Sequence, residues 1–204
     1  MKKKSTRFWA KLLGLGLSLV PVAEALATIT LLPTGSPRQI ILRVGSNNGT
    51  VNRVDFDVSG ANLAQNPQPV QGVPTNGAPA TSPAGGVEIF LQTRNRNVNG
   101  VDTTIFLTAD SSSGLTCQSA ASCGSTVIPF NTISWISYNQ ATNYPGLDIQ
   151  NGTFDNSTSQ RLIGVRATNT SVSFSNVLVF TYNNATIYPA GVYQGRVTYT
   201  ASMP

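Results

Sequence analysis

The two cysteines, Cys117 and Cys123, are the residues of this sequence whose spacing points most directly to chemistry. In an oxidising compartment such a pair forms a local disulfide. Closing so short a loop contributes only about 2 kcal/mol in the chain-entropy model, so the bridge would fasten a loop without holding the domain together. The alternative is a redox or metal-binding pair, but the sequence has no histidine or third cysteine to complete a ligand set. We therefore predict a disulfide, no metal site and no cofactor.

Acidic residues offer two further candidates. Asp55 and Asp57 alternate with apolar residues, and this spacing could supply the carboxylate pair of a glycoside hydrolase. A solvated sheet face has the same pattern, and we favour it. The segment from Asp148 to Asn156 is rich in oxygen ligands for calcium but lacks the regular alternation and closing Glu of a calcium loop. Turn formation by Asn and Asp explains the same residues, so we predict no catalytic residue here.

Lysine and histidine are missing from most of the chain. All lysines lie within the first 11 residues, and there is no histidine. Beyond that segment the composition excludes a Schiff-base lysine, a Ser-His-Asp triad, a histidine-ligated metal and a Lys–Asn crosslink. We expect a protein that is not an enzyme.

The first 27 residues have the layout of a secretory signal. A basic stretch is followed by the apolar run Leu12–Val22, which is about half the length needed to cross a bilayer. Ala25 and Ala27 supply the small residues of a cleavage site, so we predict cleavage before Thr28. An uncleaved N-terminal membrane anchor is the alternative. The prediction is a bacterial protein exported to the periplasm, the cell surface or the medium.

Removing this signal changes the charge of the chain. Five of the 13 basic residues and one of the eight acidic residues precede Thr28, so the remainder carries eight arginines and seven acidic residues. No cluster of arginines remains that could follow a phosphate backbone, so we expect no nucleic-acid binding. No second apolar stretch is long enough to serve as a permanent membrane span.

The remaining residues, 28–204, show the period-two alternation of half-buried strands. Residues 87–92 and 101–109 look like a β-hairpin, whereas the Pro- and Gly-rich residues 59–86 predict one long exposed loop. The strand candidates are 28–32, 38–44, 50–58, 86–92, 101–109, 127–138, 160–167, 172–182 and 194–203.

These short strands, separated by turn residues, predict a single all-β domain over residues 28–204. The expected fold is an antiparallel two-sheet sandwich, immunoglobulin-like or pilin-like. A barrel is the second choice.

The run from Tyr188 to Ala201, with Pro-Ala-Gly-Val-Tyr followed by an alternating Val/Thr/Tyr strand, resembles the last strand of bacterial pilin-like families. These include the spore-coat-U-type subunits of the chaperone–usher route. The resemblance covers about 15 residues. It implies an exported structural subunit of a pilus or cell surface, without enzymatic activity.

The same resemblance implies an incomplete immunoglobulin-like fold whose groove accepts a strand from a periplasmic chaperone and then from a like subunit. Main-chain hydrogen bonds and alternate apolar side chains hold such a strand. Thr28–Leu32 would be the donated strand, with Ile29 and Leu31 entering the partner. The residues implied for the groove edge are Tyr193, Val197, Tyr199 and Ala201.

A secreted cell-wall or glycan-binding module is the alternative from a different class. Trp135, Tyr193 and Tyr199 could form an aromatic platform for a sugar, although one Trp among alternating apolar residues also fits a sandwich core. The closing residues 198–204 resemble, more distantly, the end of sandwich domains that bind Gram-positive cell walls. A glycan partner is therefore an open expectation.

Overall fold

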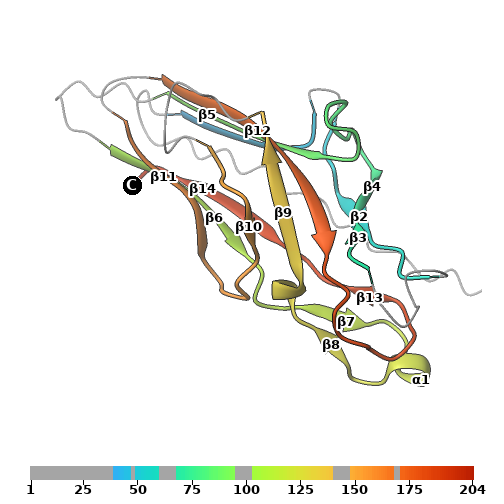
Figure 1. Ribbon diagram of the computed structural model, residues 1–204. Coiled ribbons are helices and arrows are strands. Elements are labelled where there is room, and N and C mark those ends of the chain that lie inside the picture. The colour runs from blue at the N-terminus through green and yellow to red at the C-terminus, as the bar shows by residue number, and fades with distance from the viewer. Residues whose placement is uncertain (1–38, 47–48, 60–67, 95–102, 140–147, 168–170) are drawn as a thin grey trace, which may run out of the picture.

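The computed structural model describes residues 39–46, 49–59, 68–94, 103–139, 148–167 and 171–204. These residues form antiparallel strands with very little helix, which confirms the predicted all-β fold (Figure 1). Within this described part, no helix is long and apolar enough to cross a membrane.

Two sheets form the body of the molecule. The larger sheet has the order β1 (Gln39–Val44), β5 (Val87–Arg94), β12 (Ser171–Tyr182), β9 (Ile133–Tyr138) and β10 (Gly152–Thr153), with β3 (Val70–Gln71) also on β12. The smaller sheet has the order β11 (Gln160–Ala167), β6 (Thr103–Asp110) and β14 (Thr198–Ser202).

Two minor sheets complete the described strands. One has the order β13 (Tyr193–Gln194), β7 (Leu115–Cys117) and β8 (Val127–Ile128), and the other pairs β2 (Arg53–Asp55) with β4 (Val73–Asn76). The short helix α1 (Ala120–Cys123) and the 3-10 turn η2 (Phe130–Thr132) lie on either side of β8 in the chain.

Period-two burial joins the two main sheets. The central strands β5 and β6 bury every second residue, and Ile89 and Ile105 are completely inaccessible to solvent. Side chains from both sheets belong to a single hydrophobic core, as expected when two sheets pack face to face. The inward-facing residues are Val87, Ile89, Leu91 and Thr93 of β5 and Thr103, Ile105, Leu107 and Ala109 of β6.

Apart from β11, which lies between β9 and β12 in the chain, the order of the long strands matches that of an immunoglobulin-like sandwich. In chain order β1, β5, β6, β9, β12 and β14 take the places of strands A to F, so the sheets read A-B-E-D and C-F, with β11 beside C. The complete immunoglobulin arrangement has a strand G beside F. In the described part of the chain, no strand pairs with the free edge of β14.

The predicted hairpin of residues 87–92 and 101–109 is wrong. β5 pairs with β1 and β12, whereas β6 pairs with β11 and β14, so the chain crosses from one sheet to the other between them. Alternation over two neighbouring segments is the same for a hairpin and for a crossing. The pairing of β5 and β6 therefore cannot be read from these two segments alone, because it depends on the strands that flank each of them.

The predicted long loop 59–86 is interrupted by structure. Val70–Gln71 forms β3 against the end of β12, and Val73–Asn76 forms β4 against β2. Pro74 stands within β4 because a two-stranded ribbon has an outer edge that needs no donor from that residue. Residues 60–67 of this segment lie outside the described residues.

The sandwich has two distinct ends. At the terminal end, Gln39, Arg94 and Ser171 begin or end neighbouring strands, and Thr103 Oγ1 donates a hydrogen bond of 2.6 Å to the Pro204 carbonyl oxygen. At the opposite end, called here the disulfide end, lie β7, β8, β13 and α1 (Figure 1).

One long side of the sandwich, between β9 and β11, is closed by aromatic side chains. Phe154, in the segment that links β10 to β11, is 4% exposed. Its ring centroid lies 4.9 Å from that of Trp135, 5.9 Å from Phe180 and 5.8 Å from Phe130. Such contacts add packing energy to the area they bury.

Candidate functional site: the β1–β14 edge

The other long side of the sandwich has two free strand edges beside each other. β1 is the outer strand of the larger sheet, β14 is the outer strand of the smaller sheet, and the two lie close together across the sandwich. Among the described residues, β1 pairs only with β5 and β14 only with β6. Edge strands present unpaired main-chain N–H and C=O groups to any strand that can align with them.

Apolar side chains line this side without being fully buried. Tyr199 stands opposite Ala109 and Ala201 opposite Leu107, so both point toward the core. They contact the core yet retain solvent exposure, unlike Leu107, which has none. We call the following residues the β1–β14 edge: Leu42, Val44, Val197, Tyr199, Ala201 and Met203.

Tyr199 brings a phenol into this apolar environment. Burial raises the pKa of Tyr199 well above its ordinary value of 10.0, because an ionised phenolate would be poorly solvated against the core. The ring is therefore neutral at physiological pH. It provides a flat, uncharged surface at the centre of β14.

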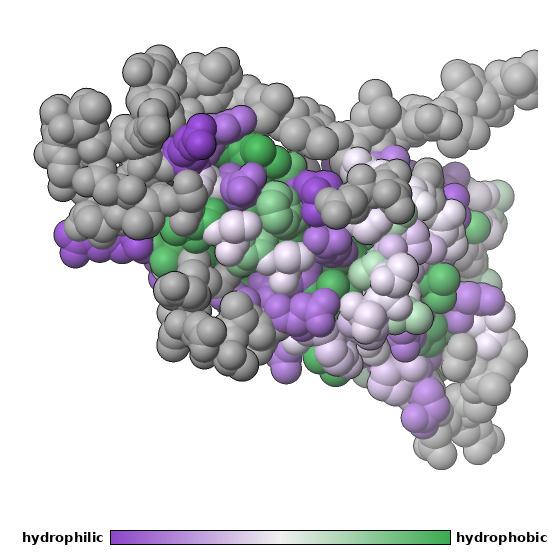
Figure 2. Space-filling view, turned by 90° about the horizontal axis from the view of Figure 1, so that it is seen from above, coloured by the Kyte–Doolittle hydropathy of each residue, from purple (hydrophilic) through white to green (hydrophobic). Residues whose placement is uncertain are grey.

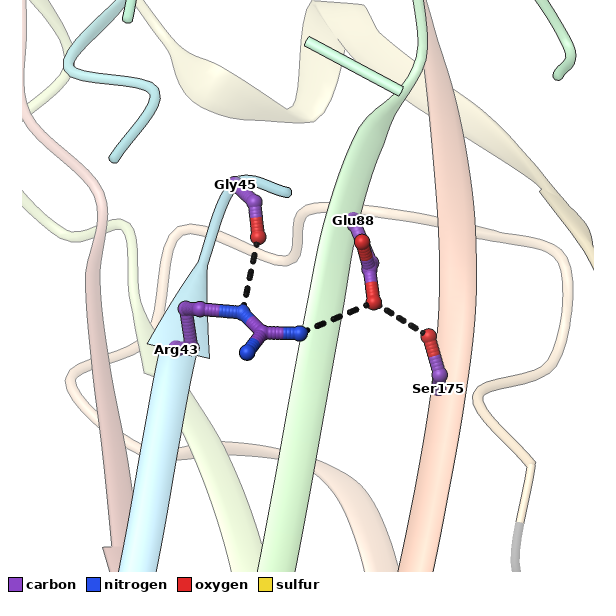
Figure 3. A network of polar contacts seen from close by, with 4 residues as sticks. All are labelled: Arg43, Gly45, Glu88 and Ser175. Atoms are coloured by element: carbon purple, nitrogen blue, oxygen red, sulfur yellow. Dashed lines mark hydrogen bonds and ion pairs between the residues drawn. The ribbon is translucent and has the colours of Figure 1, made fainter. Parts of the chain in front are cut away.

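A polar network fixes β1 to the rest of its sheet (Figure 3). Arg43 Nη2 lies 3.2 Å from Glu88 Oε1, and the same oxygen accepts a 2.7 Å hydrogen bond from Ser175 Oγ. Arg43 Nε donates to the Gly45 carbonyl oxygen at 3.2 Å, and the guanidinium lies 4.5 Å from the Phe90 ring centroid. The network connects β1, β5 and β12 on the outer face of the sheet.

Comparison with known proteins found no family model, no curated protein and no solved structure that matches this chain.

The residues predicted for a groove edge are only partly brought together. Tyr199 and Ala201 lie on one face of β14, and Val197 directly precedes this strand; all three contact the core. Tyr193 does not: the predicted strand 194–203 is divided, and Tyr193 pairs with Cys117 in the minor sheet. A Cβ on Gly195 would lie 2.4 Å from the Gly114 carbonyl oxygen, so this close approach of two backbones separates β13 from β14.

The proposed donor residues Ile29 and Leu31 lie outside the described residues, as do the cleavage-site residues Ala25, Ala27 and Thr28. Sequence reasoning missed Leu42 and Val44 as members of the edge. The strand over residues 38–44 was predicted, but nothing local showed that it would lie at the edge of its sheet.

The cysteines form the predicted disulfide. Cys117 and Cys123 are joined, with a Cα–Cα distance of 5.8 Å, and the bridge ties the end of β7 to α1. In the part of the chain that the structure describes, no three acidic, histidine or cysteine residues gather as a metal site would require.

The acidic candidates serve local structure. Asp55 Oδ2 accepts a 2.9 Å hydrogen bond from Thr75 Oγ1, which links β2 to β4. Asp155 Oδ1 accepts from the Ser157 N–H at 2.9 Å, and hydrogen bonds from Ser157 lower the pKa of Asp155. Asp148 accepts from the buried amide of Asn176 at 3.0 Å. Asp155 makes the turn contact favoured from the sequence, whereas Asp55 links two strands and Asp148 makes a core contact that the sequence did not predict.

Trp135 is a core residue. It is 4% exposed, and its Nε1 donates to the Gln150 carbonyl oxygen at 2.8 Å. The ring therefore cannot serve as an exposed platform for a sugar. Elsewhere, apolar residues reach the surface between polar ones on the face shown from above in Figure 2.

Proposed function

We propose that this protein is an exported, non-enzymatic structural subunit of a bacterial surface or fimbrial assembly, and that its β1–β14 edge accepts a β-strand from a partner protein. One observation carries the proposal. The strands take places A to F of an immunoglobulin-like sandwich, and the free edge of β14, where strand G would pair, adjoins inward-facing apolar side chains that stay partly exposed.

Strand addition would both pair the free edge of β14 and cover the partly exposed apolar side chains beside it. A partner strand would supply hydrogen-bond partners to the edge of β14, and its alternate side chains would cover Tyr199, Ala201 and Leu42. An apolar side chain of the partner strand that passes from solvent to full burial contributes about 1.5–3 kcal/mol. The edge residues are already partly buried, so covering them contributes less, and the main-chain hydrogen bonds add to both.

This sequence contains a segment whose alternating apolar residues suit the donated strand. Thr28–Leu32 places Ile29 and Leu31 two residues apart, so both point to one face of an extended strand. We propose that this segment of one subunit enters the edge of another, after a periplasmic chaperone has held the same place. The disulfide suits an oxidising compartment of this kind.

Substitutions on β14 test the proposal. Ala201→Glu puts a charge on the inward face of the edge, whereas Thr200→Glu, on the adjacent exposed position, puts the same charge on the outward face. We expect wild type and Thr200→Glu to form an SDS-resistant ladder that collapses on boiling, and Ala201→Glu to stay monomeric.

Circular dichroism identifies a variant that merely fails to fold. The proposal is overturned if folded Ala201→Glu assembles like wild type. It is also overturned if an acceptor-only variant, Ile29→Asn with Leu31→Asn, does not bind a synthetic peptide of residues 28–38.

A further inference from the structure

We infer that the disulfide end carries a second contact surface, formed by Val127, Ile187 and Val192, which packs against the terminal end of the next copy of this chain. This inference rests on the proposed strand addition and specifies how the bodies of two copies meet. The three residues are called here the apolar tip.

The three apolar side chains of the apolar tip are exposed to solvent. Ile187 is 95% exposed, Val192 69% and Val127 47%. Single apolar residues on a surface are ordinary, but several at one end of a molecule mark an interaction site. Val127 and Val192 both lie beside β7. Thr116 pairs with Val127, and the Gln118 N–H donates to the Val192 carbonyl oxygen at 2.9 Å.

The loop that presents Ile187 and Val192 is held firmly in place. Tyr193 Oη donates to the Pro189 carbonyl oxygen at 2.8 Å. Gly191 lies against the disulfide so closely that a Cβ there would be 2.5 Å from Cys123 Sγ. The loop therefore presents Ile187 and Val192 in a fixed conformation, supported by its contact with the disulfide.

The length of the donor segment brings a second copy to this surface. Only residues 33–38 separate the proposed donor strand from β1, and six extended residues span at most about 20 Å. The body of the donor copy must therefore begin within about 20 Å of whichever end of β14 its donor strand leaves, which brings it close to the surface at that end.

Strand direction selects the end. Every strand pair described in this protein is antiparallel, and antiparallel pairs are slightly more stable per residue. A donor strand antiparallel to β14 leaves it at Thr198, four residues after Gln194 of the disulfide-end sheet. A parallel donor would leave at Ser202, beside the terminal end, and the apolar tip would stay uncovered.

The resulting arrangement is head to tail. Gln39 begins β1 at the terminal end, so the terminal end of the donor copy faces the apolar tip of the acceptor. A contact between two different surfaces repeats from copy to copy and generates an open filament.

Charge at the apolar tip tests the inference. Ile187→Asp combined with Val192→Asp places two carboxylates there, and the matched control is Val73→Asp, a position on β4 that is 55% exposed. We expect the tip variant, built in the acceptor-only background, to bind the 28–38 peptide with wild-type Kd. In the otherwise unaltered chain we expect it to need about tenfold more protein to assemble, measured by sedimentation velocity.

The outcomes separate the two proposals. Normal peptide binding with assembly equal to that of wild type and Val73→Asp would overturn the apolar-tip contact and leave strand addition standing. If the acceptor-only protein fails to bind the peptide, strand addition is overturned, and the head-to-tail contact that depends on it falls with it.

Discussion

The two long sides of the sandwich differ in what covers their inward-facing residues. On the β9–β11 side, residues 148–160 cross from one sheet to the other, and Ile149 and Phe154 from this segment are 1% and 4% exposed. On the β1–β14 side no described segment crosses, and Leu42 and Tyr199 remain partly exposed although both contact the core. Equal alternation therefore yields full burial only where another stretch of chain covers the gap between the sheets.

Truncation of matched aliphatic residues should show the largest difference between the two sides. Ile149→Ala removes fully buried atoms, so we expect the free energy of unfolding to fall by about 3–4 kcal/mol. Leu42→Ala removes atoms that already meet solvent, so we expect a loss of about 1–2 kcal/mol. Urea unfolding of the acceptor-only background, in which the proposed strand donation is blocked, measures both losses.

The same pair of variants can sharpen the comparison. With a saturating 28–38 peptide, Leu42→Ala should become more costly because the peptide covers that position, whereas the cost of Ile149→Ala should not change. Equal losses for both variants without peptide would contradict the distinction between a closed and an open side.

Alkaline titration should reveal Tyr199 on the open side. Its pKa is raised in the folded protein, so as the pH rises through 10 the unfolded chain ionises first and the free energy of unfolding falls. The slope for this single group approaches about 1.4 kcal/mol per pH unit. Tyr199→Phe removes the contribution, so stability curves of the two proteins, measured in urea between pH 8 and 11, should diverge only above pH 10. Parallel curves would show that the phenol is well solvated.

The smallest expected effect concerns the network that fixes β1. Arg43→Gln should lower the free energy of unfolding by about 1 kcal/mol, because the ion pair with Glu88 is only partly buried and is screened by salt. A double-mutant cycle with Glu88→Gln should give a coupling energy of about 0.5–1 kcal/mol that shrinks in 1 M NaCl. The matched pair Arg53 and Asp55, which is more exposed, should show less coupling. Equal coupling in both pairs would mean that the network adds nothing specific to β1.

Much of the fold followed from the sequence because period-two burial is a local property. The alternation in residues 160–167 and 172–182 predicted β11 and most of β12, and turn residues marked the ends of most strands. The disulfide followed from the count of cysteines and the predicted export. These features depend on neighbours in the chain.

Which strands pair with each other could not be predicted in the same way. β5 and β6 alternate as hairpin strands do, yet each pairs with strands far away in the sequence. Tyr193 and Tyr199 share one phase in the sequence, but the contact between Gly195 and Gly114 places them in different sheets. Which strand is outermost, and therefore which residues form the β1–β14 edge, depends on the whole arrangement.

The absence of charge from β14 bears on how the purified protein can be handled. Its residues Thr-Tyr-Thr-Ala-Ser include no lysine, arginine, aspartate, glutamate or proline. Such residues usually prevent an edge strand from pairing with other chains. With this edge uncovered, the protein should associate with almost any extended chain that has a suitable apolar pattern. Purification together with a covering peptide should yield a monodisperse sample where the bare protein precipitates.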